Sequence, residues 1–202
     1  MSLRDELRAD AKRRESQHLR RQRRVQGVRD GVSALVDGQD LLNFSSNDYL
    51  GFAQHPKVID AFRNAAAEYG VGSAGSALVS GYFESHRALE TQAANLFGYD
   101  ACLYAGSGYL ANIGVLQTLL DEKSVCVQDK LNHACLLDGA RISGAGLKRF
   151  AHADTAAAGK LCSEAAGNRL FLVSDGVFSM DGDAARITEL STIAKQHDAT
   201  LM

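Results

Sequence analysis

Several short segments of the chain combine glycine with polar side chains, as ligand-binding loops do. The segment Ala105–Asn112 reads AGSGYLAN and joins a predicted strand to a predicted helix. Glycine at such a junction lets the backbone approach a ligand, and free amides in the first helical turn attract phosphate. Many strand-to-helix turns are glycine-rich for steric reasons alone, so phosphate binding and a plain turn both remain open here.

Two further polar segments follow predicted strands. His133 comes after one strand and opens a helix, and Asp175–Asp183 (DGVFSMDGD) follows the clearest buried strand. We expect Asp175 and Ser179 to lie just beyond the carboxyl end of that strand, where α/β proteins gather ligand-binding groups. The alternatives are a capping or packing role for His133 and a turn in which Asp and Ser cap backbone groups.

The glycine-rich loop Gly70–Gly81 lies between two predicted helices. Small residues in this number indicate a tight turn, a close approach to a ligand or another subunit, or a plain mobile connection. Walker loops, GxSxG elbows, HExxH motifs and zinc-binding patterns are absent from the sequence.

The elements that must position these segments alternate along the chain. Hydrophobic periodicity predicts helices over residues 3–24, 57–69, 84–97, 109–120, 134–143, 155–166 and 187–197. It predicts strands over 101–104, 124–128, 147–150 and 169–174, another from 200 onward, and a pair about an Asp-Gly turn within 35–44. The fold class is therefore α/β, with a mostly parallel sheet flanked by helices.

Composition bounds the function further. The 202 residues carry a net charge of −2, and lysine and arginine crowd the first thirty positions among acidic residues. This pattern predicts the solvated face of a helix, with a basic arm for nucleic acid over residues 4–29 as the weaker alternative. The four cysteines have no metal-binding spacing and are expected to be free thiols. Without an export signal or an apolar run long enough for a bilayer, the protein is expected to be cytoplasmic and to bind neither membrane nor nucleic acid.

In this order, the segments resemble the α-oxoamine synthases, a family of pyridoxal-phosphate-dependent enzymes. The resemblance covers Leu19–Met202 and rests on Asn43–Gly51 (NFSSNDYLG), Ser80–Tyr82, Asn132–Ala134 and Asp175–Gly182. It implies the large domain of the fold type I (aspartate aminotransferase-like) enzymes, a homodimer, and pyridoxal 5'-phosphate as cofactor.

The resemblance also implies a reaction and a domain organisation. The family condenses an amino acid with an acyl-CoA, losing carbon dioxide and releasing CoA. The most similar branch uses L-alanine and pimeloyl-CoA or a pimeloyl carrier protein, in biotin biosynthesis; the glycine C-acetyltransferase branch is the alternative. Residues 1–45 are expected to form an N-terminal helix and short strands, and residues 46–202 an incomplete large cofactor-binding domain.

By the same resemblance, four residues contact the cofactor. Gly108 and Tyr109 would bind its phosphate through backbone amides, His133 would stack on its ring and meet the substrate, and Ser179 would hydrogen-bond near the ring hydroxyl.

The acyl substrate is assigned to Arg21 by the same resemblance, because a guanidinium suits a carboxylate or phosphate. Arg20 beside it is the alternative register, and Asn47 is placed near the substrate-bound cofactor.

The family's catalytic residues are not among those present. The aspartate facing the pyridine nitrogen, the histidine after it and the Schiff-base lysine all fall beyond Met202 in the family pattern, and no lysine here has the family's lysine context. We therefore expect an incomplete chain, inactive by itself, whose parent carries the activity. A non-catalytic binding or dimerisation module is the alternative.

Overall fold

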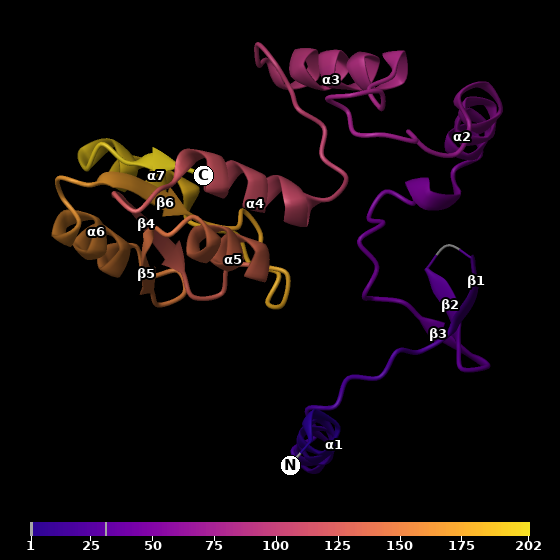
Figure 1. The fold of residues 1–202 in the computed structure, drawn as a ribbon, viewed down its shortest axis with the longest axis horizontal. Coiled ribbons are helices and arrows are strands. Elements are labelled where there is room, and N and C mark those ends of the chain that lie inside the picture. The colour runs from indigo at the N-terminus through magenta and orange to yellow at the C-terminus, as the bar shows by residue number, and fades with distance from the viewer. Residues whose placement is uncertain (1, 31) are drawn as a thin grey trace. The chain divides into compact units, whose positions relative to one another are not determined.

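The computed structural model describes residues 2–30 and 32–202. The chain forms two compact units, Met1–Phe83 and Glu84–Met202, each with its own elements (Figure 1). The predicted domains, 1–45 and 46–202, were divided by their expected part in cofactor binding, whereas the two units are divided by contacts within the chain. The predicted domains therefore stay a prediction.

The first helix is shorter than the sequence indicated. α1 (Leu3–Ser16) begins at a capping box formed by Ser2 and Asp5, and it buries none of its residues. His18 then takes a left-handed conformation with φ 56°. The prediction of a helix to residue 24 was wrong, because a charged helix without an apolar face to bury gains too little from packing to extend further.

Three short strands follow in an antiparallel sheet. Their order is β1 (Gln26–Asp30), β2 (Ser33–Val36) and β3 (Gln39–Leu42). Asp37 and Gly38 connect β2 to β3 with φ of 49° and 82°, the positive angles that a two-residue hairpin turn requires. The predicted pair of strands is confirmed, and β1 was not predicted.

A single-turn helix, η1 (Phe52–Gln54), leads into α2 (Pro56–Tyr69). Pro56 occupies the first turn of α2, and the His55 side chain caps the helix by accepting from the Lys57 N–H. The predicted helix over residues 57–69 is confirmed, because proline is tolerated where the backbone N–H has no helical partner.

The glycine-rich loop Gly70–Gly81 closes on itself. A Cβ at position 81 would lie 2.0 Å from the carbonyl oxygen of Gly75. The carbonyl of Ser76 accepts hydrogen bonds from the N–H groups of Ser80 and Gly81 at 3.1 and 2.9 Å. Of the three interpretations of this loop, the structure favours the tight turn.

The second unit alternates helices and strands. Its elements are α3 (Glu84–Phe97), α4 (Gly108–Leu119), β4 (Ser124–Asp129), α5 (Ala134–Ile142), β5 (Gly146–Phe150), α6 (Thr155–Glu164), β6 (Arg169–Val173), α7 (Ile187–Gln196) and β7 (Thr200–Leu201). The strands lie in the order β5-β4-β6-β7 and every pairing is parallel. The predicted α/β class and parallel sheet are confirmed.

One predicted strand is missing from this unit. Residues 101–104 form no strand, and the Tyr104 N–H donates to the Glu90 carboxylate at 2.8 Å rather than to a neighbouring strand. The short apolar run was misassigned because a strand is defined by a hydrogen-bonded partner, which local sequence does not reveal.

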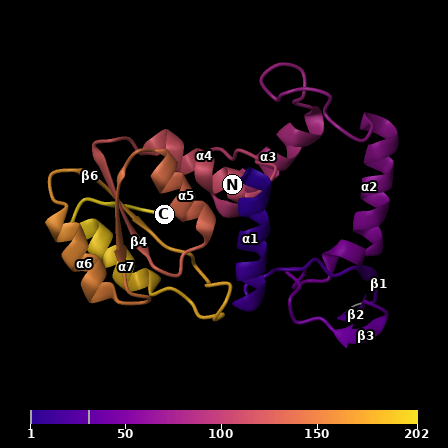
Figure 2. The same cartoon turned by 60° about the horizontal axis from the view of Figure 1, so that its bottom comes forward.

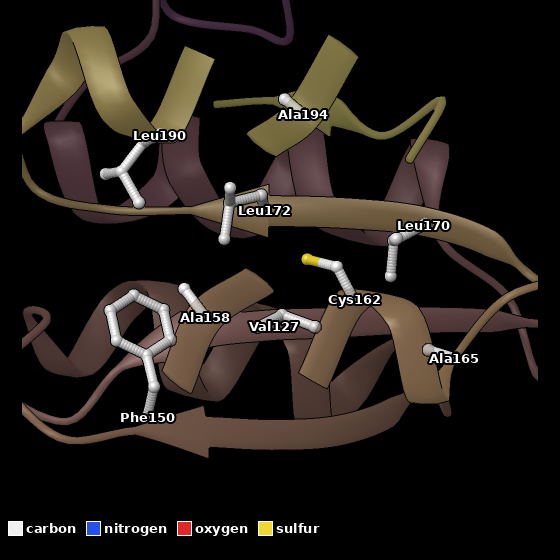
Figure 3. Close-up of a cluster of buried hydrophobic side chains, with 9 residues drawn as sticks. All are labelled: Val127, Phe150, Ala158, Cys162, Ala165, Leu170, Leu172, Leu190 and Ala194. Carbon is white, nitrogen blue, oxygen red and sulfur yellow. The ribbon is translucent and has the colours of Figure 1, made fainter. Parts of the chain in front are cut away.

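Helices cover both faces of the parallel sheet. Val127 and Leu172 point to one face and belong to a core cluster with α6 and α7, drawn in Figure 3. Cys126 and Phe171, their neighbours in sequence, point to the other face and join a cluster with α4 and α5. Figure 2 shows the pairing of α4 with α5 and of α6 with α7. Successive strand residues face opposite layers, so apolar residues follow one another without alternation in Leu170–Val173 of β6 and Val125–Val127 of β4.

The cysteines are free, as predicted. Cys126, Cys135 and Cys162 are buried, and Cys102 is half-buried. Burial raises the pKa of the Cys126 thiol to about 11, so it stays protonated at neutral pH. Among residues 2–30 and 32–202, the helices are each too short or too polar to cross a bilayer.

Candidate functional site

The carboxyl ends of β4 and β6 are joined by the side chain of Asn132. Its Nδ2 donates to the Val173 carbonyl at 2.8 Å, and its Oδ1 accepts from the Asp175 N–H at 2.9 Å. The Asp175 carboxylate in turn accepts from the His133 N–H at 2.7 Å. This three-bond clamp, which we call the Asn132–Asp175 clamp, fixes the two loops against each other at the edge where α/β proteins bind ligands.

His133 lies in this clamp as the N-cap of α5. Its Nδ1 accepts from the Cys135 N–H at 3.2 Å and lies 2.9 Å from the Cys135 thiol. Because Nδ1 accepts a hydrogen bond, we assign the ring proton of the neutral imidazole to Nε2. The side chain is exposed, so capping and ligand contact are compatible: one nitrogen holds the helix and the other is available.

The start of α4 supplies backbone donors. Ser107 is the N-cap, and its hydroxyl accepts from the Leu110 N–H at 3.2 Å. Within the described part of the chain, the N–H groups of Gly108 and Tyr109 have no hydrogen-bond partner. A Cβ at Gly106 or Gly108 would meet no atom within 4 Å. The first turn of this helix is therefore open, with two free donors.

Tyr109 ties the start of α4 to α5. Its hydroxyl donates to the Asp138 carboxylate at 2.9 Å. This hydrogen bond raises the pKa of the Tyr109 phenol, because the phenolate would lose it and face a second negative charge. The contact links Tyr109 to the helix that His133 caps.

Ser179 lies in the loop of residues 175–183, which we call the Ser179 loop. Val177 pairs with Ala184 in an isolated bridge, and the Phe178 N–H donates to the Asp183 carbonyl at 2.9 Å. Phe178 is 2% exposed and anchors the loop, whereas Ser179 is exposed. The Asp175 carboxylate accepts a backbone N–H, as the turn interpretation predicted. Ser179 is exposed, and its contact with a ligand stays a prediction.

His152 contacts the same loop. Its Nδ1 lies 3.1 Å from Oδ1 of Asp129, and its Nε2 lies 2.9 Å from Oδ2 of Asp183. The hydrogen bond to Asp129, more than that to Asp183, raises the pKa of His152 above its ordinary value.

The structure therefore connects some of the residues singled out by sequence and leaves others separate. His133 is bonded to the strand end from which the Ser179 loop departs, and Tyr109 is bonded to the helix that His133 caps. Arg21, Arg20 and Asn47 belong to the first unit, where Arg21 is exposed on the segment between α1 and β1.

Sequence reasoning gave no role to Asn132 or His152. Asn132 directly precedes His133, so its place after a strand was an available signal for a polar group at the site, although its bonding partners lie 41 and 43 residues away. The partners of His152 lie 23 and 31 residues away and were likewise not predictable from local sequence.

Comparison with known sequences places the chain in a family. Residues 39–202 match the family model for aminotransferase class I and II. The 8-amino-7-oxononanoate synthase of Saccharophagus degradans is 47% identical over all of this chain and 51% of its own length. The synthase of the same name from Stenotrophomonas maltophilia is 49% identical over 92% of this chain and 46% of its own length. The chain thus spans about half the length of the curated relatives it matches.

Solved structures agree on the fold. The serine palmitoyltransferase of Sphingomonas wittichii superposes with a TM-score of 0.88 at 28% identity, over 98% of this chain and 50% of its own. A serine palmitoyltransferase variant with pyridoxal phosphate superposes with a TM-score of 0.91 at 26% identity, over all of this chain and 52% of its own. The predicted likeness to fold type I pyridoxal-phosphate enzymes is confirmed, and the chain belongs to the aminotransferase class I and II family.

Proposed function

We propose that this chain is part of an 8-amino-7-oxononanoate synthase, a pyridoxal-phosphate-dependent acyltransferase that condenses L-alanine with pimeloyl-CoA or a pimeloyl carrier protein. The observation that carries the proposal is the similarity to two such synthases, at 47% and 49% identity over nearly the whole chain. The clamped strand ends support it, because they hold His133 and the loop that carries Ser179 on one connected framework.

The residues present fit the cofactor. The free N–H groups of Gly108 and Tyr109 would hold its phosphate, since helix N-termini favour anions. The absence of a Cβ at Gly106 and Gly108 leaves room for a group to approach that backbone. When bound, pyridoxal phosphate supplies the electron sink for carbanion chemistry.

His133 and Ser179 would act beside that cofactor. The capping bond at Nδ1 fixes the His133 ring, so its Nε2–H would be the group offered to ring or substrate. The anchored Ser179 loop presents an exposed hydroxyl that would donate to the ring hydroxyl. Both side chains orient a ligand, and neither supplies the covalent link that the family's lysine makes.

Arg21 is proposed as the contact for the acyl substrate, because its exposed guanidinium can pair with a carboxylate or with CoA phosphate.

We also propose a cytoplasmic homodimer. Phe44, Val71 and Leu78 are 93%, 97% and 98% exposed, which is unusual for large apolar side chains and is expected where another surface covers them.

The decisive test uses the complete product of the gene that encodes this chain. Purified protein with pyridoxal phosphate is incubated with L-alanine and pimeloyl-CoA, and free CoA and the amino-ketone product are measured. Parallel reactions contain glycine with acetyl-CoA, for the alternative branch, and L-serine with palmitoyl-CoA, for the enzyme named in the structural comparison. Turnover of either of these pairs in preference to alanine and pimeloyl-CoA would overturn the substrate assignment while keeping the family.

A backbone substitution tests the phosphate site. Gly108→Pro removes one N–H donor at the first helical position, where proline is tolerated, and Ser107 already has the extended conformation that must precede proline. Loss of a hydrogen bond to a charged group should weaken pyridoxal phosphate binding about tenfold. Absorbance titration with pyridoxal phosphate measures this affinity.

The matched control is Gly108→Ala, which keeps the N–H and places a Cβ in open space. It should bind pyridoxal phosphate as the unchanged protein does. Equal affinity of the proline and alanine variants would show that the Gly108 amide does not hold the phosphate.

A further inference from the structure

We propose that His152 is a positioning residue that ties the Ser179 loop to the sheet by bridging Asp129 and Asp183. Its significance for a cofactor rests on the function proposed above, whereas the bridge itself is a statement about loop order. Nothing in the family comparison assigns a role to His152.

The bridge starts from a rigid support. Asp129 ends β4 and is 2% exposed. Its carboxylate accepts from the Leu131 N–H at 2.8 Å and from the Ala153 N–H at 2.9 Å, in addition to the contact with His152. A buried carboxylate with two backbone donors has one well-defined position, so it can fix the imidazole that it contacts.

The far end of the bridge belongs to the loop. The His152 Nε2 meets Asp183, whose own carbonyl accepts the Phe178 N–H. The His152 ring also meets the Phe178 ring edge-on, with centroids 4.4 Å apart and an angle of 83°. The imidazole thus contacts both the side chain that anchors the loop and the residue that closes it, on either side of Ser179.

The charge state of His152 decides how many of these bonds exist. Two carboxylates accept from two ring nitrogens only if both nitrogens carry protons, which requires the imidazolium. Asp181 brings a third carboxylate within 4.8 Å of His152 and Asp183. The two carboxylates that bond the ring, those of Asp129 and Asp183, favour the cation and raise the pKa of His152.

Charged side chains of neighbouring elements do not offset the effect of Asp129 and Asp183 on the pKa of His152. Arg186 lines the small cavity beside Asp129 and Phe178, and Asp154 uses its carboxylate to cap α6. Neither forms a hydrogen bond or ion pair with the His152 ring in the described part of the chain.

The pH dependence follows from the raised pKa. The folded protein holds the His152 proton more tightly than the unfolded chain, whose histidine has the ordinary value of 6.5. The bridge therefore contributes fully below that value, and its contribution is lost as pH rises through the raised pKa of the folded state. The loop should loosen in mildly alkaline solution.

Hydrogen exchange measures this loosening directly. The N–H groups of Phe178 and Gly182 both bond within the loop, to Asp183 and Phe178. In the unchanged protein, without pyridoxal phosphate, their protection factors should fall about fivefold between pH 6 and pH 9, a modest change because the cluster is partly exposed. The Leu172 amide in the β6 ladder is the internal reference and should not respond.

Substitution of His152 identifies the group responsible. His152→Gln keeps one side-chain donor but cannot titrate. Compared with the unchanged protein, the variant should show lower protection of the loop amides at pH 6 and equal protection at pH 9. His197→Gln, at the end of α7 and away from the loop, is the matched control and should keep the normal pH profile. A His152→Gln profile identical to that of the unchanged protein would overturn the proposal.

Two further measurements distinguish failure of the His152 bridge from failure of the proposed cofactor site. Nuclear magnetic resonance titration of the His152 ring in the unchanged protein gives its pKa without any substitution, and a value at or below the ordinary one would also refute the bridge. Pyridoxal phosphate affinity of Ser179→Ala is measured separately: unchanged affinity removes Ser179 from the proposed cofactor site but leaves the bridge intact. A loop without pH response in a protein that still binds the cofactor refutes the bridge alone.

Discussion

Replacing Asn132 with alanine should lower the free energy of unfolding of the Glu84–Met202 unit by about 3 kcal/mol. The side chain gives and receives one hydrogen bond across two strand ends, at 2.8 Å to the Val173 carbonyl and 2.9 Å from the Asp175 N–H. Alanine removes both bonds at a half-buried position and leaves the Asp175 N–H without its acceptor, while the Val173 carbonyl keeps its place in the β4–β6 ladder. An unpartnered backbone donor costs roughly 1–3 kcal/mol and the second lost hydrogen bond about 1 kcal/mol, so the two together account for the expected loss.

Urea unfolding followed by circular dichroism gives the stability of each variant, and the midpoint shift at constant slope gives the change. The control is Asn168→Ala, which removes a single local bond from Nδ2 to the Ala165 carbonyl at 3.0 Å. That change should cost about 1 kcal/mol. If the two variants lose the same stability, the Asn132–Asp175 clamp contributes nothing beyond an ordinary hydrogen bond.

The Asn132–Asp175 clamp also shows which features of the site could not be predicted from the sequence. Predicting His133 and Ser179 at strand ends needed only local patterns and the rule for parallel sheets, and the structure places both there. The bond between their strands joins residues 41 to 43 positions apart, so only the folded topology reveals it. The chemical roles of these residues came from family resemblance, because no spacing specifies a pyridine ring.

The same distinction holds for the secondary structure: elements with local signals were predicted, and elements that depend on distant partners were not. α3 was predicted with its observed bounds because its apolar stripe and terminal Gly98, with φ 72°, are local signals. The end of α1 and the false strand at residues 101–104 depended on packing or pairing partners. β1 (QGVRD) lacks the apolar alternation of a strand and owes its state to pairing with β2.

The largest single loss of stability should come from Leu172→Ala, at about 3–4 kcal/mol. Leu172 is completely buried in β6, which pairs with β4 on one side and β7 on the other. Its side chain fills the space between the sheet and the helices α6 and α7 (Figure 3). A central strand held on both sides relaxes little, so alanine leaves a cavity as well as losing the transfer free energy of the removed atoms.

Two controls separate the cavity from the substitution itself. Leu96→Ala makes the same chemical change at a side chain that is 79% exposed, and it should alter stability by less than about 0.5 kcal/mol. Leu172→Met keeps the volume and should cost less than about 1.5 kcal/mol. Urea unfolding of the three variants checks the expected order of their losses of stability.

Because β6 ends at Val173 and delivers Asp175 to the clamp, Leu172→Ala should also reduce the exchange protection of the Asp175 and His133 amides. Unchanged protection of these two amides would mean that the strand ends are held by the clamp independently of the core beneath them.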